Sequence, residues 1–114
     1  MTAMSGRSPV VFAADPAARG RFVESAVGAH LVATVTRDEE VTYWREGSSE
    51  VDFVLTGPAG LLAIEVASGD SKAGLPGLDA FGRRFGSARK LLIGGRGLAL
   101  ETALSTPARD LHAV

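Results

Sequence analysis

The stretch Glu50–Asp70, EVDFVLTGPAGLLAIEVASGD, decides how the rest of the chain is arranged. It predicts two strands, residues 50–56 and 60–68, around a reversal at Gly57-Pro58-Ala59-Gly60. Glycine and proline are the residues that most strongly interrupt a strand pattern, so this short segment between two apolar runs indicates a turn. We therefore expect the two strands to lie side by side and antiparallel.

Each of these strands carries one acidic residue that the strand pattern does not require, Asp52 in the first and Glu65 in the second. Glu65 lies inside the apolar run Leu61–Val66, which is typical of a strand that is covered on both faces. A charged group that is buried without a partner is costly, so we expect something to compensate Glu65.

Two carboxylates on neighbouring strands are suited to share a divalent cation. If Asp52 and Glu65 point the same way, their oxygens match the one or two carboxylates with which proteins usually hold Mg²⁺. Such a cation would activate water and neutralise charge on a phosphodiester that is being cut. The alternative is that these carboxylates pair with an arginine such as Arg45 or accept backbone N–H groups, and spacing alone does not separate the two interpretations.

Composition indicates one domain of an ordinary soluble kind. The 114 residues are 46% hydrophobic and 22% charged, and the formal net charge is −1. There is no cysteine, which excludes disulfides and thiolate metal sites and fits a cytoplasmic protein. No apolar run approaches the roughly 20 residues of a membrane span, and no organic cofactor is implied, so we expect neither a membrane nor such a cofactor as a partner.

The remaining elements follow from periodicity and from helix start and stop signals. The order is helix, three strands, helix and strand, which predicts an α/β fold: a mixed sheet whose first three strands form an antiparallel meander and whose fourth lies parallel to the third, flanked by helices. The expected helices are 15–33, with Asp15 as N-cap, 75–85 and 100–104, and the other strands are 41–46 and 88–93.

The first helix presents an apolar face to the core and brings one carboxylate to its margin. Glu24 falls at the edge of that face, from where it would add a third, water-mediated metal ligand or form a salt bridge. His30 falls in its middle and is expected to be a hydrogen-bonded core histidine. The face comprises Phe22, Val23, Ala26, Val27, His30, Leu31 and Thr34, with Arg21, Ser25 and Gly28 opposite.

Basic residues gather in the last third of the chain. They would hold phosphates near a metal site, or they are the solvated face of a helix, and both interpretations stay open. These residues are Arg83, Arg84, Arg89, Lys90 and Arg96.

At this point the residues resemble a known family. The order αβββαβ with Glu24, Asp52 and Glu65-Val66-Ala67 resembles the PD-(D/E)XK nuclease superfamily, the restriction-endonuclease-like fold that Holliday junction resolvases share. More narrowly, the chain is similar to the uncharacterised domain at the C-terminus of many prokaryotic AAA-type ATPases. The resemblance covers residues 15–107 and leaves 1–14 as a lead-in and 108–114 as a tail. It rests on the segments GRFVESAVGAHL, VTYWREGSSEVDFVL, AIEVASGD, GLDAFGRRF and LLIGGRGLALETALSTP.

The resemblance implies an ATPase segment ahead of this domain, which the chain lacks. Its Gly94-Gly95-Arg96-Gly97 run has neither the lysine nor the serine or threonine of a phosphate-binding Walker loop. We therefore interpret the chain as an isolated or truncated C-terminal domain, with a neighbouring ATPase, a second copy of itself or DNA as its expected partner.

One departure from the superfamily motif decides the functional expectation. The motif implies a catalytic lysine two residues after the acidic strand residue, and that position is Ala67. Losing such electrostatic stabilisation costs orders of magnitude in rate. We expect a degenerate module that binds DNA or a partner without cutting. The alternative is an active Mg²⁺-dependent DNA endonuclease in which Asp52 and Glu65 act with a relocated Lys72.

Overall fold

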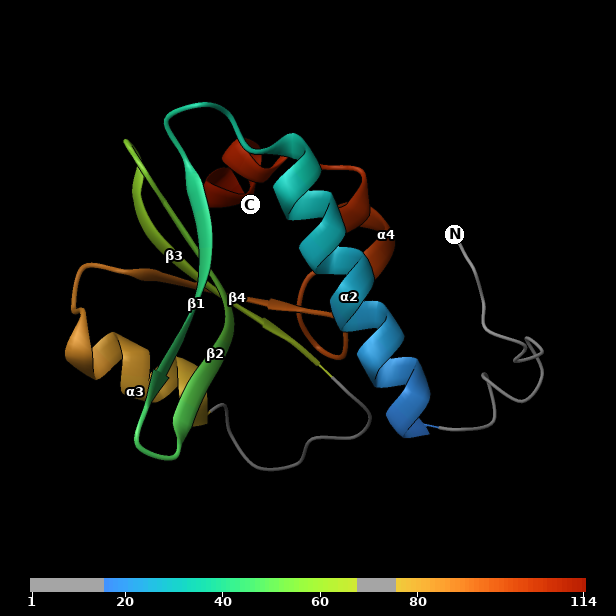
Figure 1. Ribbon diagram of the computed structural model, residues 1–114, viewed down its shortest axis with the longest axis horizontal. Helices are drawn as coiled ribbons and strands as arrows, with labels where there is room; N and C mark the ends of the chain where they lie inside the picture. The colour runs from blue at the N-terminus through green and yellow to red at the C-terminus, as the bar shows by residue number, and fades with distance from the viewer. Residues whose placement is uncertain (1–15, 68–75) are drawn as a thin grey trace.

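The structure, a computed structural model, describes residues 16–67 and 76–114 (Figure 1). Its helices and strands follow the order expected from the sequence, and their ends agree to within one or two residues wherever those ends are described. In chain order they are α2 (Pro16–Thr34), β1 (Glu40–Glu46), β2 (Ser49–Gly57), β3 (Gly60–Val66), α3 (Pro76–Arg84), β4 (Arg89–Ile93), α4 (Leu100–Leu104) and the 3-10 helix η1 (Ala108–Ala113).

The four described strands form one mixed sheet in the order β1-β2-β3-β4 (Figure 1). Neighbours β1/β2 and β2/β3 are antiparallel because tight turns join them, and β3/β4 are parallel because the intervening chain, with α3, crosses over. The predicted mixed α/β sheet flanked by helices is therefore confirmed. No helix in the described ranges is long and apolar enough to span a membrane.

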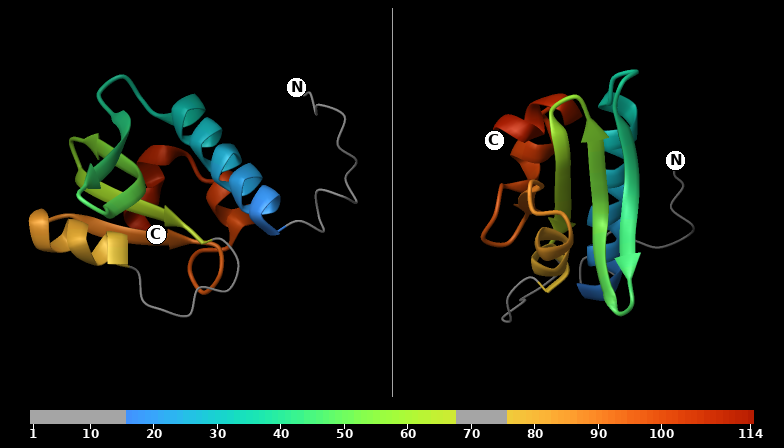
Figure 2. Two further views of the ribbon diagram at one scale, coloured as in Figure 1. Left: turned by 60° about the horizontal axis from the view of Figure 1, so that its bottom comes forward. Right: turned by 90° about the vertical axis from the view of Figure 1, so that its left-hand side faces the viewer.

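Helices cover both faces of the sheet (Figure 2). Leu62 and Ile64 of β3 join the larger cluster with α2, α4 and η1, whereas the intervening Ala63 joins the smaller cluster with α3. Successive side chains of a strand point to opposite faces, so both faces of β3 are buried, as its apolar sequence predicts. In the smaller cluster Trp44 meets the Phe81 ring edge-on at 5.2 Å between centroids.

The face that α2 buries differs from the predicted one at its start. Val27 and Leu31 are fully buried, as expected, but Phe22 is 53% exposed. Gly28, expected to point away from the core, instead lies against the Phe53 ring of β2. The helix has apolar residues on more than one side, so periodicity alone did not show which stripe meets the sheet.

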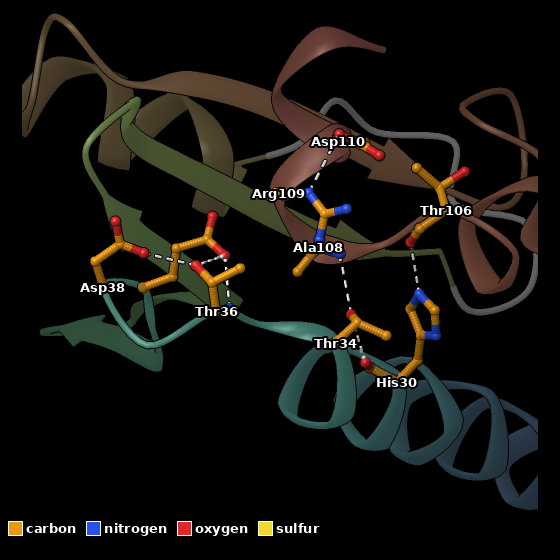
Figure 3. A network of polar contacts seen from close by, with 9 residues as sticks. His30, Thr34, Thr36, Asp38, Thr106, Ala108, Arg109 and Asp110 are labelled. Carbon is orange, nitrogen blue, oxygen red and sulfur yellow. Dashed lines mark hydrogen bonds and ion pairs between the residues drawn. The ribbon is translucent and has the colours of Figure 1, made fainter.

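The C-terminal residues pack onto α2 through a set of hydrogen bonds that we call the C-terminal clasp (Figure 3). His30 Nε2 lies 2.6 Å from the Thr106 carbonyl oxygen, which confirms His30 as a hydrogen-bonded histidine. The Thr34 hydroxyl donates to the His30 carbonyl at 2.8 Å and accepts the Ala108 N–H at 3.0 Å. Ala108 and Leu111 of η1 are buried in the larger cluster, so residues 108–113 complete the core.

Candidate functional site

The candidate site lies where β2 and β3 meet α2, and its centre is the pair Asp52 and Glu65. The register pairs Phe53 with Ile64, and continuing it by one residue sets Asp52 opposite Glu65. The negative charge of Asp52 raises the pKa of Glu65, so the two carboxylates lie within electrostatic range of each other. The expectation that these two strands bring them together fits this interaction.

The side chain of Asp52 also bonds to the backbone of the neighbouring strand β3. Its Oδ2 accepts the backbone N–H of Val66 at 2.8 Å, so the side chain is held by the neighbouring strand. The predicted alternative that Asp52 pairs with Arg45 is not realised, because Arg45 donates to Glu50 Oε1 at 3.3 Å instead. The other half of that alternative, a carboxylate that accepts a backbone amide, is present.

A β-bulge in β2 sets the position of Asp52. Thr42 pairs with Val54 and Trp44 with Val51, so Asp52 and Phe53 together lie opposite one residue of β1. Val51 and Val54 consequently both join the smaller core cluster although they are three residues apart. By simple alternation Glu50, Asp52 and Val54 would share a face, and the bulge breaks this alternation. A bulge often re-aims a side chain beside an active site.

Glu65 is the most perturbed acid of the described residues. It is half-buried, and its Oε1 has no hydrogen-bond partner in the described structure. Burial is the main cause that raises the pKa of Glu65 from 4.5 to about 7. The negative charge of Asp52 adds to the rise, and a hydrogen bond from the Asp52 backbone opposes it. The sequence predicted that something compensates Glu65, and no cationic side chain of the described residues does so.

The same causes act on the two other carboxylates of the expected site. Burial raises the pKa of Asp52, the Val66 hydrogen bond lowers it, and the charge of Glu50 raises it. Burial also raises the pKa of Glu24, and the charges of Asp52 and Glu50 add to that rise. Glu24 therefore belongs to the same electrostatic neighbourhood, as its position at the margin of the helix face predicted.

Glu50 is a fourth member of this neighbourhood, and it was not among the site residues predicted from the sequence. Its charge contributes to the raised pKa of Glu24, Asp52 and Glu65 alike. The sequence feature that could have identified Glu50 is its position two residues before Asp52 on the same strand. We call Glu24, Glu50, Asp52 and Glu65 the carboxylate cluster.

The cluster suits a cation, but it is not a complete ligand cage. Residues 16–67 and 76–114 contain no group of three or more His, Cys, Asp or Glu side chains arranged to hold a metal ion. A pair of carboxylates with water as the remaining ligands is an ordinary arrangement for Mg²⁺. The buried, unpartnered Oε1 of Glu65 beside Asp52 fits that role, because an acceptor oxygen without a donor is what a cation satisfies.

Ala67 occupies the position at which the superfamily motif has its lysine. Its backbone N–H donates to the Ile93 carbonyl at 2.8 Å, which places the residue beside the end of β4. A Cβ added to Gly95 would lie 3.1 Å from the Ala67 methyl, so the turn after β4 closes tightly on this side chain. Lys72, the expected substitute for the missing lysine, lies outside the described residues.

The basic residues of the last third do not gather at the cluster. Lys90 pairs with Ala63 in the middle of β3, whereas Val66, next to Glu65, pairs with Ile93. Of the five basic residues only Arg96 lies in the turn after β4, on the Ala67 side. Arg84 instead pairs with Glu46 at 3.8 Å, and both side chains are more than half exposed, as a solvated helix face predicts.

Comparison with known proteins gives one family. The model of a domain of unknown function (DUF4143) matches residues 19–103, which include most of α2, the whole sheet and α3. The carboxylate cluster and Ala67 lie within this match. Neither curated proteins nor solved structures gave a match.

Proposed function

The chain belongs to the DUF4143 family of domains of unknown function, and we propose that it is a nuclease-like module that keeps a two-carboxylate cation site, does not cleave, and binds DNA or a protein partner. The observation that carries the proposal is the unpartnered, buried Oε1 of Glu65 beside Asp52. A fold gains no stability from such a group, so its presence supports a role in binding a cation.

Asp52 and Glu65 are the residues that would hold Mg²⁺. When bound, the cation would supply positive charge to a phosphate or carboxylate oxygen of the partner. The part of the chain is to hold the two carboxylates side by side. The Val66 N–H fixes Asp52, and burial keeps water from Glu65 Oε1.

The absence of cleavage is proposed from position 67. A half-buried methyl group at Ala67 brings no ammonium to the cluster. No described basic side chain is among the causes that shift the pKa values of Glu24, Asp52 or Glu65, so apart from a bound cation only carboxylates would face a charge that develops during phosphodiester cleavage. That environment opposes the transition state, which favours binding over catalysis.

Calorimetric titration with Mg²⁺ and Mn²⁺ tests the cation site. We expect saturable binding to the protein and a loss of at least tenfold in affinity in Asp52→Asn and in Glu65→Gln. The matched control is Asp110→Asn, which alters an exposed acid of η1 that does not belong to the carboxylate cluster. Binding that survives both site variants would refute the assignment of these two residues.

A gain-of-function variant tests why cleavage is absent. Ala67→Lys restores the missing ammonium, so we expect Mg²⁺-dependent nicking of supercoiled DNA that Ala67→Met, of similar length and without charge, does not show. Asp52→Asn in the Ala67→Lys background should abolish the nicking. Mg²⁺-dependent cleavage by the unaltered protein would overturn the proposal and favour the active nuclease that uses Lys72.

A further inference from the structure

A turn rich in glycine follows β4, and we call its residues 94–97, Gly-Gly-Arg-Gly, the glycine turn. The strands β3 and β4 run parallel, so both end at the same edge of the sheet, and Glu65 near the end of β3 pairs with Leu92 near the end of β4 (Figure 2). The glycine turn therefore begins two residues after the partner of Glu65. In open α/β sheets ligands bind outside the carboxyl ends of the strands, so this edge is where a ligand is expected.

Backbone hydrogen bonds hold the glycine turn and leave two of its amides free. The N–H groups of Gly94 and Gly97 donate to the carbonyl oxygens of Leu98 and Gly94, at 2.7 and 2.8 Å. The N–H groups of Gly95 and Arg96 lie between them in the chain and have no acceptor among the described residues. Successive backbone amides in a turn form a nest that binds an anion, so the glycine turn has the donors for one.

Three of the four positions of the glycine turn favour glycine, and Arg96 occupies the fourth. Gly94 and Gly95 have φ angles of 85° and 57°, in the left-handed region that residues with a Cβ rarely adopt. A Cβ added to Gly97 would overlap the carbonyl oxygen of Leu92. Arg96 therefore extends from a backbone whose shape is fixed on both sides of it.

The guanidinium group of Arg96 is available to a ligand. Its side chain is exposed and takes part in none of the ion pairs among residues 16–67 and 76–114. Arg45 and Arg84, by contrast, each pair with a glutamate. A planar guanidinium group binds two oxygens of a phosphate at once, and the two free amides of the glycine turn add donors beside it.

The glycine turn closes on the face of β3 that carries Glu65. The N–H of Ala67 donates to the Ile93 carbonyl oxygen at 2.8 Å, so strand pairing extends to Ala67. Glu65 and Ala67 are two residues apart, so their side chains share a face and lie about 7 Å apart along the strand. A Cβ added to Gly95 would lie 3.1 Å from the Ala67 methyl carbon, so one ligand can span the glycine turn and the carboxylate cluster.

We infer that the glycine turn binds a phosphate group of a nucleotide or of a nucleic acid strand, through the guanidinium group of Arg96 and the N–H groups of Gly95 and Arg96. A cation held by Asp52 and Glu65 would meet the same ligand from the other side and offset the negative charge of the cluster. This inference deepens the proposed function and rests on its cation site. It adds the chemical class of the ligand and the residues that bind its phosphate.

Fluorescence anisotropy with a fluorescein-labelled single strand of oligothymidine tests the inference. In the presence of Mg²⁺ we expect saturable binding that Arg96→Gln weakens about tenfold, with a salt dependence reduced by about one phosphate contact. Arg96→Lys keeps the charge without the paired donors and should retain part of the affinity. The matched control is Arg83→Gln, which removes the charge of an exposed arginine in α3 and should leave the affinity unchanged.

Competition with thymidine monophosphate distinguishes the two sources of the phosphate. Displacement of the labelled strand shows that a nucleotide is sufficient, and binding without displacement shows that the ligand is a strand; either result supports the inference. Equal affinities of Arg96→Gln and the unaltered protein, or no binding of either probe, would overturn it.

Calorimetric titration of the same proteins with Mg²⁺ separates the inference from the proposed function. Arg96→Gln should keep Mg²⁺ and lose affinity for the strand, whereas Glu65→Gln should lose Mg²⁺. A protein that binds Mg²⁺ but neither probe keeps the proposed cation site and overturns the inference. A protein that binds neither Mg²⁺ nor the probes overturns both.

Discussion

The carboxylate cluster and the C-terminal clasp are both built on α2, and they satisfy their polar groups in opposite ways. In the clasp every bond has a donor and an acceptor, as where the Thr34 hydroxyl bridges His30 and Ala108 (Figure 3). In the cluster four acids of like charge lie together, and Glu65 Oε1 is buried without a described partner. The bonds of the clasp follow the ordinary rule for buried polar groups. Glu65 Oε1 departs from it, as do the two ring nitrogens of His112 in η1, which are buried without a described partner.

The two regions have opposite effects on the stability of the fold. The clasp stabilises the fold, because it brings Leu111 into the larger core cluster and satisfies the backbone around it. The cluster lowers stability, since burial and mutual repulsion raise the pKa of Glu24, Asp52 and Glu65. Substitutions should therefore have opposite signs in the two regions.

The largest expected effect is a loss in the clasp region. Leu111 is 1% exposed within the larger core cluster, so Leu111→Ala leaves a cavity and should lower the free energy of unfolding by about 3 kcal/mol. Urea denaturation followed by circular dichroism measures this change. Val114→Ala, at the 48% exposed terminal residue, is the matched control and should change stability by less than about 0.5 kcal/mol. Equal effects would mean that η1 does not pack as described.

The next effect has the opposite sign and belongs to Glu65. Its pKa is raised from 4.5 to about 7, so between these values the folded state binds more protons than the unfolded state. The stabilisation by protonated Glu65 is present below about pH 4.5 and is lost as the pH rises through 7. Glutamine is neutral at every pH. The free energy of unfolding of Glu65→Gln should therefore exceed that of the unaltered protein between pH 5 and pH 8.

We expect that gain to reach about 1–2 kcal/mol, less than the full shift implies, because solvent screens a half-exposed carboxyl group. Urea unfolding in the presence of a chelator at several pH values measures it, and Glu101→Gln serves as the exposed control. If the free energy of unfolding changes with pH in the same way for Glu65→Gln and the unaltered protein, the pKa of Glu65 is not raised by folding. The contrast between the two regions would then not be electrostatic.

The fold was predictable because its signals are local. The apolar run around Ile64, the turns between strands and the crossover through α3 each specify one connection, and together they leave one sheet order. The stripe of α2 that packs was not predictable at Phe22 or Gly28, because their burial depends on the Phe53 ring of another element. No pattern indicated η1, whose burial depends on hydrogen bonds to residues more than 70 positions away.

Part of the carboxylate cluster was identifiable from the sequence, but Glu50 was missed and the arrangement was less predictable. Asp52 and Glu65 stood out because acids interrupt strand patterns, and the register brings them together. The bulge beside Asp52 arises from the pairing of β2 with β1, which alternation within one strand does not reveal. The same long-range pairing explains why Arg45 meets Glu50 instead of Asp52.

A smaller loss should follow from removing one hydroxyl of the clasp. Thr34→Val keeps the shape of the side chain but leaves the part-buried Ala108 N–H without its acceptor. We expect a loss of about 1 kcal/mol, measured by urea denaturation. Thr34→Ser keeps the hydroxyl and should retain most of the stability. If serine and valine cost the same, the methyl group of Thr34 rather than its hydrogen bonds supports the joint.

The smallest effect concerns Arg45, the one arginine of the described residues that is bonded to a member of the carboxylate cluster. Arg45 and Glu50 are 66% and 63% exposed, so Arg45→Gln should lower stability by less than about 0.5 kcal/mol at pH 7. Arg84→Gln, which removes a similarly exposed ion pair with Glu46, is the matched control. A loss above about 1 kcal/mol for Arg45→Gln alone would mean that Arg45 compensates the whole cluster. The cluster would then be a salt-bridge network like many others, and its unpaired charge would no longer point to a cation.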